Sequence, residues 1–216
     1  MRAAPGSPRC DTARQLPETV GARRCWLTHP RRKGRRIRWG TVQGFLISGV
    51  PGAGKTTVAR ALAARFPRSA HIEGDLVGEQ FIVSGFVPPQ GPPEDEAQRQ
   101  LQLRRRNMRA LADSYAEAGF LPVIDDVVVS PGVLDGYLDG LRCRPLLFVQ
   151  LAPSLDVIRL RDSTRNKQVF DLWSHLDAEM RARMTAFGLW LDTSRMTAAQ
   201  TVSQILARSE EAVVAG

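Results

Sequence analysis

Short apolar runs alternate with amphipathic segments along most of the chain. Four apolar runs rich in branched side chains predict strands, and a shorter run that ends in polar residues predicts a fifth; together they occupy residues 42–49, 69–75, 121–129, 144–152 and 187–193. Helical periodicity follows the first run, where Val58, Leu62 and Phe66 recur at four-residue steps, and appears again in residues 198–208. Five strands alternating with helices predict an α/β fold with a five-stranded parallel sheet sandwiched by helices.

The longest helical segment follows a loop rich in glycine and proline. Residues 85–93 contain this Gly and Pro cluster, which predicts a mobile loop. Residues 94–120 begin with three acidic residues and contain a glycine near their end, which predicts one long helix. On the helical wheel Arg104 lies on the apolar stripe with Met108, whereas Arg105 lies toward the polar side. Because an unpaired buried guanidinium is costly, Arg104 either reaches solvent at the helix end or binds an acidic or anionic group in a substrate cleft.

Length and charge refine this picture. A chain of 216 residues can bury one substantial core. Residues 1–40 hold 11 of the 30 Lys and Arg but 2 of the 22 Asp and Glu, so residues 41–216 carry 19 basic against 20 acidic residues. We therefore expect a basic N-terminal extension over residues 1–40 and a folded domain over residues 41–216. A nucleic acid is not an expected partner of this nearly neutral domain.

Three interpretations of the N-terminal extension stay open. Its content of Arg, Pro and Gly, without apolar periodicity, favours disorder. It is also compatible with a basic arm attracted to RNA or a membrane, and with a start site placed upstream of a true beginning near Val42. No apolar run approaches the roughly 18 residues that span a bilayer, and the three cysteines lack metal-site spacing. We expect no membrane association and a reducing, cytoplasmic compartment.

A nine-residue segment carries the clearest chemical signal. Residues 49–57, "GVPGAGKTT", contain the phosphate-binding pattern G-x-x-x-x-G-K-[ST], known as Walker A, between a predicted strand and a predicted helix. Backbone N–H groups of such a loop surround phosphate oxygens, the lysine reaches the β- and γ-phosphates, and the hydroxyl of Thr56 is a Mg²⁺ ligand. The residues predicted to bind the nucleotide are Gly49, Gly52, Ala53, Gly54, Lys55, Thr56 and Thr57.

Acidic residues follow two of the predicted strands. Asp75 comes after the second strand, where a carboxylate faces the ligand crevice and can accept a hydroxyl proton; its alternative role is to cap the next helix. Glu73 is the substitute candidate for the same proton transfer. Asp125 and Asp126 end the third strand and, because side chains alternate along a strand, should face opposite ways. The sequence does not show which of the two faces the metal; we favour Asp125 for the water shell of the metal, and Asp126 for substrate or acid chemistry.

Basic residues after the fourth strand are the remaining candidates. Arg161 and Arg165 are four residues apart, so one helical face could bring both guanidinium groups over a transferred phosphate, in a lid that closes on the nucleotide. A solvated helix face is the alternative. The three histidines, His29, His71 and His175, are scattered along the chain and are expected to be structural.

The order of these parts resembles the small P-loop kinases, a group of P-loop NTPases that includes shikimate and gluconate kinases, and within this group it is most similar to the chloramphenicol phosphotransferases and their relatives. The matching segments are "GVPGAGKTT", "EGD", "VIDDVVV", "RDSTR" and "LDTS", within residues 42–210. The resemblance implies ATP with Mg²⁺ as cofactors, Asp75 as base toward an acceptor hydroxyl, and a mobile lid. The loop and long helix after residue 85 depart from the family pattern, so the resemblance does not name the acceptor.

Three functions follow from these residues. The first is an ATP-dependent phosphotransferase that transfers the γ-phosphate to a hydroxyl of a small molecule, such as an antibiotic or a metabolite. In it Lys55, Asp75, Arg161 and Arg165 would be catalytic, Asp75, Arg104 and Asp126 would bind the substrate, and Thr56 and Asp125 would bind the metal. The second is a kinase for the 5′-hydroxyl of a nucleoside or polynucleotide. The third is a nucleotide-dependent switch without catalysis.

Overall fold

The computed structural model describes residues 44–163 and 175–214 of the chain. Five of its strands form a parallel sheet in the order β2-β3-β1-β4-β5. The strands span Gly44–Ser48 (β1), Ser69–Glu73 (β2), Leu121–Asp125 (β3), Leu146–Leu151 (β4) and Leu189–Leu191 (β5). All five lie within the predicted segments, so the predicted parallel sheet is confirmed.

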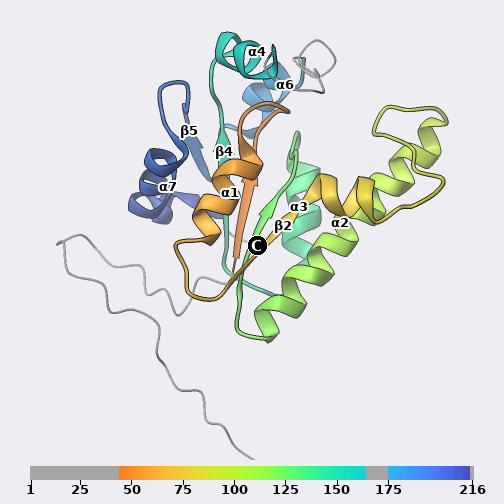
Figure 1. Ribbon diagram of the computed structural model, residues 1–216, viewed down its shortest axis with the longest axis horizontal. Helices are drawn as coiled ribbons and strands as arrows, with labels where there is room; N and C mark the ends of the chain where they lie inside the picture. Colours follow the sequence, from red (N-terminus) through yellow and green to blue (C-terminus); the bar gives the residue numbers. More distant parts are fainter. Residues whose placement is uncertain (1–43, 164–174, 215–216) are drawn as a thin grey trace, which may run out of the picture. The chain divides into compact units, whose positions relative to one another are not determined.

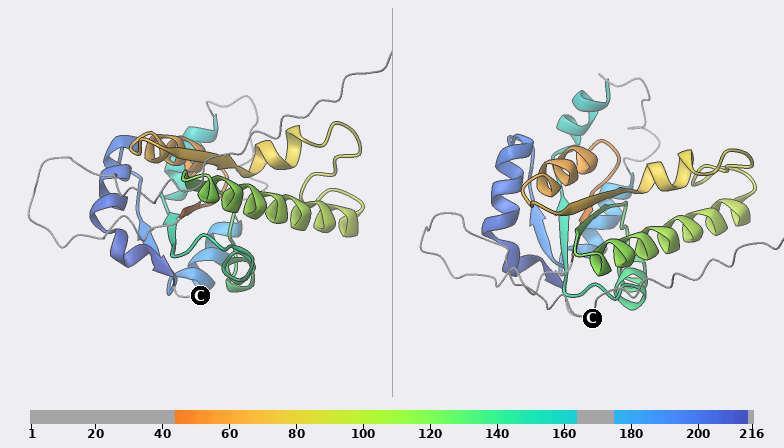
Figure 2. Two further views of the ribbon diagram at one scale, coloured as in Figure 1. Left: turned by 90° about the horizontal axis from the view of Figure 1, so that it is seen from below. Right: turned by 60° about the horizontal axis from the view of Figure 1, so that its bottom comes forward.

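Helices cover both faces of this sheet (Figure 1). They span Lys55–Ala63 (α1), Glu94–Glu117 (α2), Pro131–Gly140 (α3), Leu155–Ser163 (α4), His175–Met184 (α6) and Ala198–Ala207 (α7). α1 packs against α7 and the strands on one face, whereas α2 packs against α3 and the strands on the other (Figure 2). The α/β fold class predicted from the sequence is therefore confirmed.

Side-chain alternation divides the apolar interior into two cores. Phe45 and Ile47 of β1 join the core on the α1 side, whereas Leu46, between them, joins the core on the α2 side. In β3, Val123 and Ile124 divide in the same way. Since both faces of these inner strands are buried, the residues before the last one of each strand are all apolar in the sequence rather than alternating with polar ones. The same alternation places Asp125, the last residue of β3, and Asp126, which follows it, on opposite sides of the sheet.

Three short elements were not predicted. A two-residue strand, Val213–Val214 (β6), pairs antiparallel with the start of β4, after a 3₁₀ turn at Ser209–Ala212 (η2). A π-helical turn, Leu76–Gln80 (η1), follows β2 where only a loop and possible helix start were expected. Its glycine, Gly78, lets the backbone approach Arg104 of α2, because a Cβ there would lie 2.6 Å from Cδ of Arg104. η1 thus fits closely against α2.

Residues 1–40 and residues 164–174, which include the second half of the predicted lid segment at residues 159–168, lie outside the described residues. The N-terminal extension and the mobile lid therefore stay predictions. Among the helices that the structure describes, none has both the length and the apolar character needed to cross a membrane.

Candidate phosphoryl-transfer site

The phosphate-binding loop joins β1 to α1. Gly52 and Gly54 adopt positive φ angles of 88° and 95°, and the N–H of Ala53 donates to the carbonyl oxygen of Val50 at 3.0 Å. A Cβ on Gly52 would approach Cγ2 of Ile158 in α4 to 2.9 Å, so this glycine also permits close packing. The loop leads directly into the N-terminus of α1, whose free N–H groups and dipole favour an anion.

Lys55 is the first residue of α1 and lies at the centre of the charged groups. Its Nζ donates to the carbonyl oxygen of Val50 at 3.4 Å. Burial lowers the pKa of Lys55, and the carboxylates of Asp125, Asp75 and Asp126 oppose this shift. All three predicted acids therefore lie within electrostatic reach of this one ammonium group, as the convergence of strand ends had suggested.

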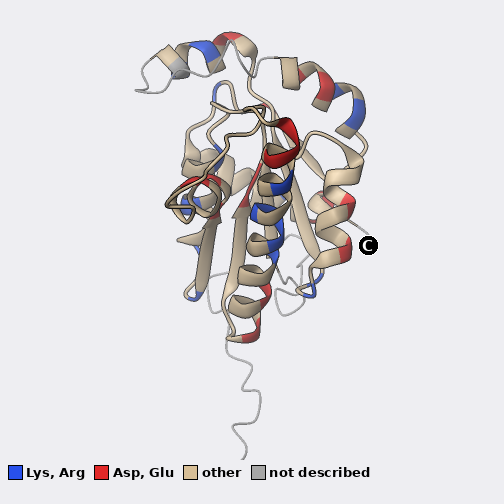
Figure 3. Ribbon diagram, turned by 90° about the vertical axis from the view of Figure 1, so that its right-hand side faces the viewer, with Lys and Arg blue, Asp and Glu red and all other residues tan. Residues whose placement is uncertain are grey.

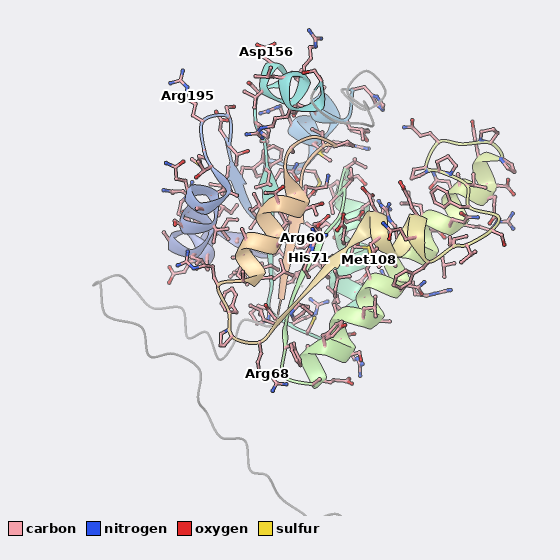
Figure 4. All side chains as sticks on the ribbon, viewed as in Figure 1. Arg60, Arg68, His71, Met108, Asp156 and Arg195 are labelled. Atoms are coloured by element: carbon pink, nitrogen blue, oxygen red, sulfur yellow. The ribbon has the colours of Figure 1, made fainter. Side chains whose placement is uncertain are left out.

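Asp125 faces the α1 side of the sheet. Its Oδ2 lies 2.5 Å from Nε2 of His71 on β2, and its side chain is buried. The next acid on the same side, Glu73, binds Arg60 of α1 at 3.0 Å; Figure 4 labels His71 on β2 and Arg60 on α1. His71 was expected to be a structural histidine, but its contact with Asp125 places it beside the candidate site.

Asp126 faces the α2 side, and its carboxylate is held by three side chains. Oδ1 accepts from Nη2 of Arg104 at 2.5 Å, whereas Oδ2 accepts from Nε of Arg105 at 3.2 Å and from the hydroxyl of Tyr137 at 2.9 Å. Burial acts to raise the pKa of Asp126, but the two guanidinium groups and these hydrogen bonds outweigh it and lower that pKa. Burial and the adjacent Asp126 raise the pKa of Tyr137 well above its usual value.

Arg104 reaches into the site rather than to solvent. Its guanidinium binds Asp126 and also lies 3.6 Å, through Nη1, from Oδ1 of Asp75. Its side chain is only 10% exposed. Of the two placements that the sequence left open, the structure therefore has the one in which Arg104 binds acids of the cleft. Figure 3 shows the basic residues of α2 as a blue band in the middle of the helix.

Asp75 differs from the other acids in its exposure. Its side chain is 78% exposed, and it makes no side-chain hydrogen bond to the start of η1, which it precedes. The alternative of a helix cap is therefore not supported. Asp75 is a solvent-accessible carboxylate beside Arg104 and within electrostatic reach of Lys55.

Arg161 of α4 joins the phosphate-binding loop to the segment after β5. Its Nη1 donates to the carbonyl oxygen of Ala53 at 3.4 Å, and its Nη2 donates to that of Thr193 at 3.2 Å. The N–H of Ser154 donates to Oγ of Ser194 at 2.8 Å, which ties the same segment to the start of α4. Arg165, predicted to act with Arg161, lies outside the described residues.

Thr56 and Asp125 are the predicted metal ligands. Mg²⁺ keeps several water molecules and needs only one or two protein oxygen ligands besides phosphate, so a hydroxyl next to Lys55 and a carboxylate on the α1 side fit its chemistry. Within residues 44–163 and 175–214, no group of three or more acidic, His or Cys side chains forms a closed metal site.

The sequence did not identify three of the residues around these acids. Arg105 was placed on the polar side of its helix, but its side chain is only 17% exposed and its Nε donates to Asp126. Tyr137 comes from α3, and His71 pairs with Asp125 because two neighbouring strands share a register; neither has a spacing that would reveal it.

Residues 45–187 match the AAA_33 family model, described as an AAA domain. The match covers more than half of the chain, and the chain belongs to this family. None of the curated protein sequences matches the chain.

Solved structures resemble the chain over most of its length. A sugar kinase from Janibacter sp. HTCC2649 has 23% identity and a TM-score of 0.58, covering 79% of this chain and 96% of its own. The tunicamycin resistance protein of Deinococcus radiodurans has 22% identity and a TM-score of 0.55, with 80% and 98% covered. A gluconokinase from Sinorhizobium meliloti 1021 has 20% identity and a TM-score of 0.51, with 77% and 91% covered. The fold is that of the small P-loop kinases, which confirms the resemblance seen in the sequence.

Proposed function

We propose that the protein is an ATP-dependent phosphotransferase that transfers the γ-phosphate of ATP to a hydroxyl group of a small molecule. The observation that carries this proposal is the state of the acids around Lys55. Asp125 and Asp126 are buried and bound by His71 and by Arg104, respectively, whereas Asp75 is 78% exposed. An exposed carboxylate next to a phosphate-binding lysine is suited to meet an incoming hydroxyl group.

In the proposed reaction the acceptor oxygen attacks the γ-phosphorus while Asp75 takes the hydroxyl proton. A bond forms between the acceptor oxygen and the phosphorus, the bond from phosphorus to the β,γ-bridging oxygen breaks, and ADP leaves. Lys55 and Arg161 balance the negative charge on the phosphoryl oxygens, and Arg165 would act with Arg161. The backbone of residues 49–57 would bind the phosphates.

The remaining predicted residues have supporting roles. Mg²⁺ bound through Thr56 and Asp125 would polarise the phosphate oxygens when present. Asp126 has both oxygens occupied by protein donors, so we propose that it acts on substrate through Arg104, whose guanidinium it holds beside Asp75. We also propose that the protein works in the cytoplasm, where ATP is supplied and a buried free thiol such as Cys143 stays reduced.

The test is ADP release from Mg-ATP by the full chain in the presence of hydroxylated antibiotics, sugars, nucleosides and a 5′-hydroxyl oligonucleotide. The wild type should respond to at least one small hydroxyl compound. Asp75→Asn should lower kcat at least a hundredfold while the Kd for ATP changes less than threefold. Asp95→Asn, an equally exposed acid at the start of α2, should behave as wild type.

Two outcomes would contradict the proposal. If ATP binds but no acceptor stimulates ADP release, and Asp75→Asn equals wild type, the nucleotide-dependent switch becomes the better interpretation. If only the oligonucleotide stimulates release, the acceptor is a polynucleotide, although residues 41–216 carry nearly balanced charge.

A further inference from the structure

His71 is a buried side chain to which the proposed reaction assigns no role. It lies on β2 and is only 13% exposed. Its Nε2 lies 2.5 Å from Oδ2 of Asp125, whose own side chain is 5% exposed. Because an ionised carboxylate accepts hydrogen bonds and donates none, Nε2 carries the hydrogen and donates it to Asp125. The contact is therefore a hydrogen bond with a fixed direction, from β2 to the end of β3.

The register of the two strands decides from which side His71 meets Asp125. β2 and β3 pair in parallel, with Glu73 opposite Asp125 and His71 opposite Val123. His71 thus lies two positions before the residue opposite Asp125, toward the interior of the sheet. The ligand crevice of an open α/β sheet lies beyond the carboxyl ends of the strands. The imidazole therefore holds Asp125 from the interior and leaves the crevice open to other groups.

The second oxygen of Asp125 is left for another partner. Within the described part of the chain, Oδ1 of Asp125 accepts no hydrogen bond. Lys55 is within electrostatic reach of this carboxylate but, among the same described residues, forms no ion pair with it. Glu73, the next acid on this face of β2, is bound by Arg60 at 3.0 Å. A carboxylate oxygen of this kind suits the water shell of a hydrated Mg²⁺.

We propose that His71 is a positioning residue for metal binding, which holds Oδ2 of Asp125 and leaves Oδ1 to meet the water shell of Mg²⁺. This inference rests on the proposed function for the assignment of Asp125 to the metal. Hydrogen-bond partners of metal-binding groups fix the orientation of those groups, and their loss weakens metal affinity by roughly 10–100-fold. His71 itself touches neither the metal nor the phosphates, and its effect passes through Asp125.

Mn²⁺ binding tests this role without any turnover. Mn²⁺ replaces Mg²⁺ as a spectroscopic probe, and EPR measures its Kd for the full chain saturated with the non-hydrolysable ATP analogue AMP-PNP. His71→Phe keeps a ring in the strand and removes the donor, so it should raise this Kd about tenfold. His71→Gln places an amide N–H near the position of Nε2 and should stay within about threefold of wild type. An unchanged Kd in His71→Phe, or an equal loss in His71→Gln, would overturn the inference.

Ser69→Ala is the matched control for a lost hydrogen bond on β2. Oγ of Ser69 donates to the carbonyl oxygen of Ala63 at 2.7 Å, on the same face of β2 but farther from the carboxyl end of the strand. This variant should leave the Kd for Mn²⁺ within about twofold of wild type. Urea unfolding confirms that each variant is folded, and His71→Leu, which also lacks the donor, replaces His71→Phe if the latter does not fold. A tenfold loss in folded Ser69→Ala would show that any weakening of this strand has the same effect, and the inference would fail.

A double-mutant cycle separates positioning from a direct role. Asp125→Asn should itself weaken Mn²⁺ binding about tenfold or more, because it removes the charge that meets the metal. In the Asp125→Asn background, His71→Phe should change the Kd for Mn²⁺ less than about twofold, because its partner is already lost. A further tenfold loss in that background, or an unchanged Kd in Asp125→Asn alone, would overturn the inference.

ADP release separates this inference from the proposed function. With an active acceptor, His71→Phe should raise the Mg²⁺ concentration at half-maximal rate about tenfold and leave kcat at saturating Mg²⁺ within about threefold of wild type. Unchanged Mn²⁺ binding by His71→Phe in a working kinase would overturn this inference alone. Absence of stimulation by any acceptor, combined with Mn²⁺ binding that His71→Phe weakens and His71→Gln retains, would overturn the kinase and leave the positioning role standing.

Discussion

Nη2 of Arg104 lies 2.5 Å from Oδ1 of Asp126, and these two side chains are 10% and 1% exposed. The pair joins the long helix α2 to the end of the central strand β3. Arg105 and Tyr137 complete the hydrogen bonds of the carboxylate, so the buried charge is satisfied on both oxygens. The same carboxylate thus fixes the guanidinium that lies next to Asp75.

Asp126→Asn should strongly destabilise the fold. The change leaves two arginines, 10% and 17% exposed, without their shared counter-charge. Breaking a buried pair in this way costs about 3 kcal/mol. Urea unfolding at pH 7 measures the effect, and Asp95→Asn, which breaks the exposed pair with Arg99, should change the free energy of unfolding by less than about 0.5 kcal/mol. Equal effects of the two changes would show that the buried pair contributes no more than a surface pair.

Asp113→Asn should reduce both the stability and its dependence on pH. The buried Asp113 carboxylate accepts from the N–H groups of Arg142 and Cys143, and these hydrogen bonds outweigh burial and lower its pKa. A lowered pKa in the folded state stabilises the protein above the unfolded pKa of 3.8, and this stabilisation is lost as pH falls through the folded pKa.

Urea unfolding at pH 7, 5 and 3 measures this contribution. At pH 7 Asp113→Asn should lose about 2 kcal/mol, and its free energy of unfolding should fall less between pH 5 and pH 3 than that of wild type. Glu117→Gln, which changes an exposed partner of Arg142, is the control and should alter neither quantity appreciably. If the free energy of unfolding of Asp113→Asn falls as steeply between pH 5 and pH 3 as that of wild type, Asp113 does not contribute to the loss of stability in acid.

Gly188→Ala should destabilise the protein much more than Gly119→Ala. Both glycines have left-handed backbones, with φ of 61° and 79°. A Cβ at Gly188 would overlap the carbonyl oxygen of Phe148 in β4, whereas at Gly119 it would meet no atom within 4 Å. Both variants carry the backbone strain of about 1–2 kcal/mol, and Gly188→Ala should cost at least about 2 kcal/mol more. Thermal or urea unfolding of the two variants measures the difference. Similar losses in the free energy of unfolding would contradict the packing argument.

Arg161→Ala should weaken nucleotide binding about tenfold. Its guanidinium contacts the carbonyl oxygens of Ala53 and Thr193, which places it against the phosphate-binding loop. Removal of a charge-assisted contact of this kind corresponds to about 1.4 kcal/mol. The Kd for ATP is the measurement, and Arg159→Ala, exposed on the same helix, should leave it within twofold of wild type. If the Kd of Arg161→Ala for ATP is unchanged but kcat is reduced, Arg161 stabilises the transition state and does not contribute to ATP binding.

Much of the fold could be predicted because its signals are local. Apolar runs rich in branched side chains, such as residues 144–152, predicted buried strands, and the phosphate-binding motif predicted one strand, one loop and one helix in order. The gathering of Asp75, Asp125 and Asp126 near Lys55 followed from a general property of parallel sheets, since the carboxyl ends of the strands share one edge.

The rest of the site depends on tertiary geometry that has no local signal. Whether Arg105 turns toward solvent or toward Asp126 depends on how α2 is rotated on the sheet. The contact of His71 with Asp125 depends on the register between β2 and β3, and Tyr137 reaches Asp126 only through the docking of α3. The strand β6 is two residues long, too short for any periodicity.

Asp125 and Asp126 are adjacent in the chain but face opposite sides of the sheet, one toward α1 and the other toward α2. This arrangement makes the two halves of the site separable for protein engineering. Under the proposed function, libraries restricted to residues 81–101 leave α1 and its loop untouched, so they should retain ATP binding whatever they do to the acceptor side.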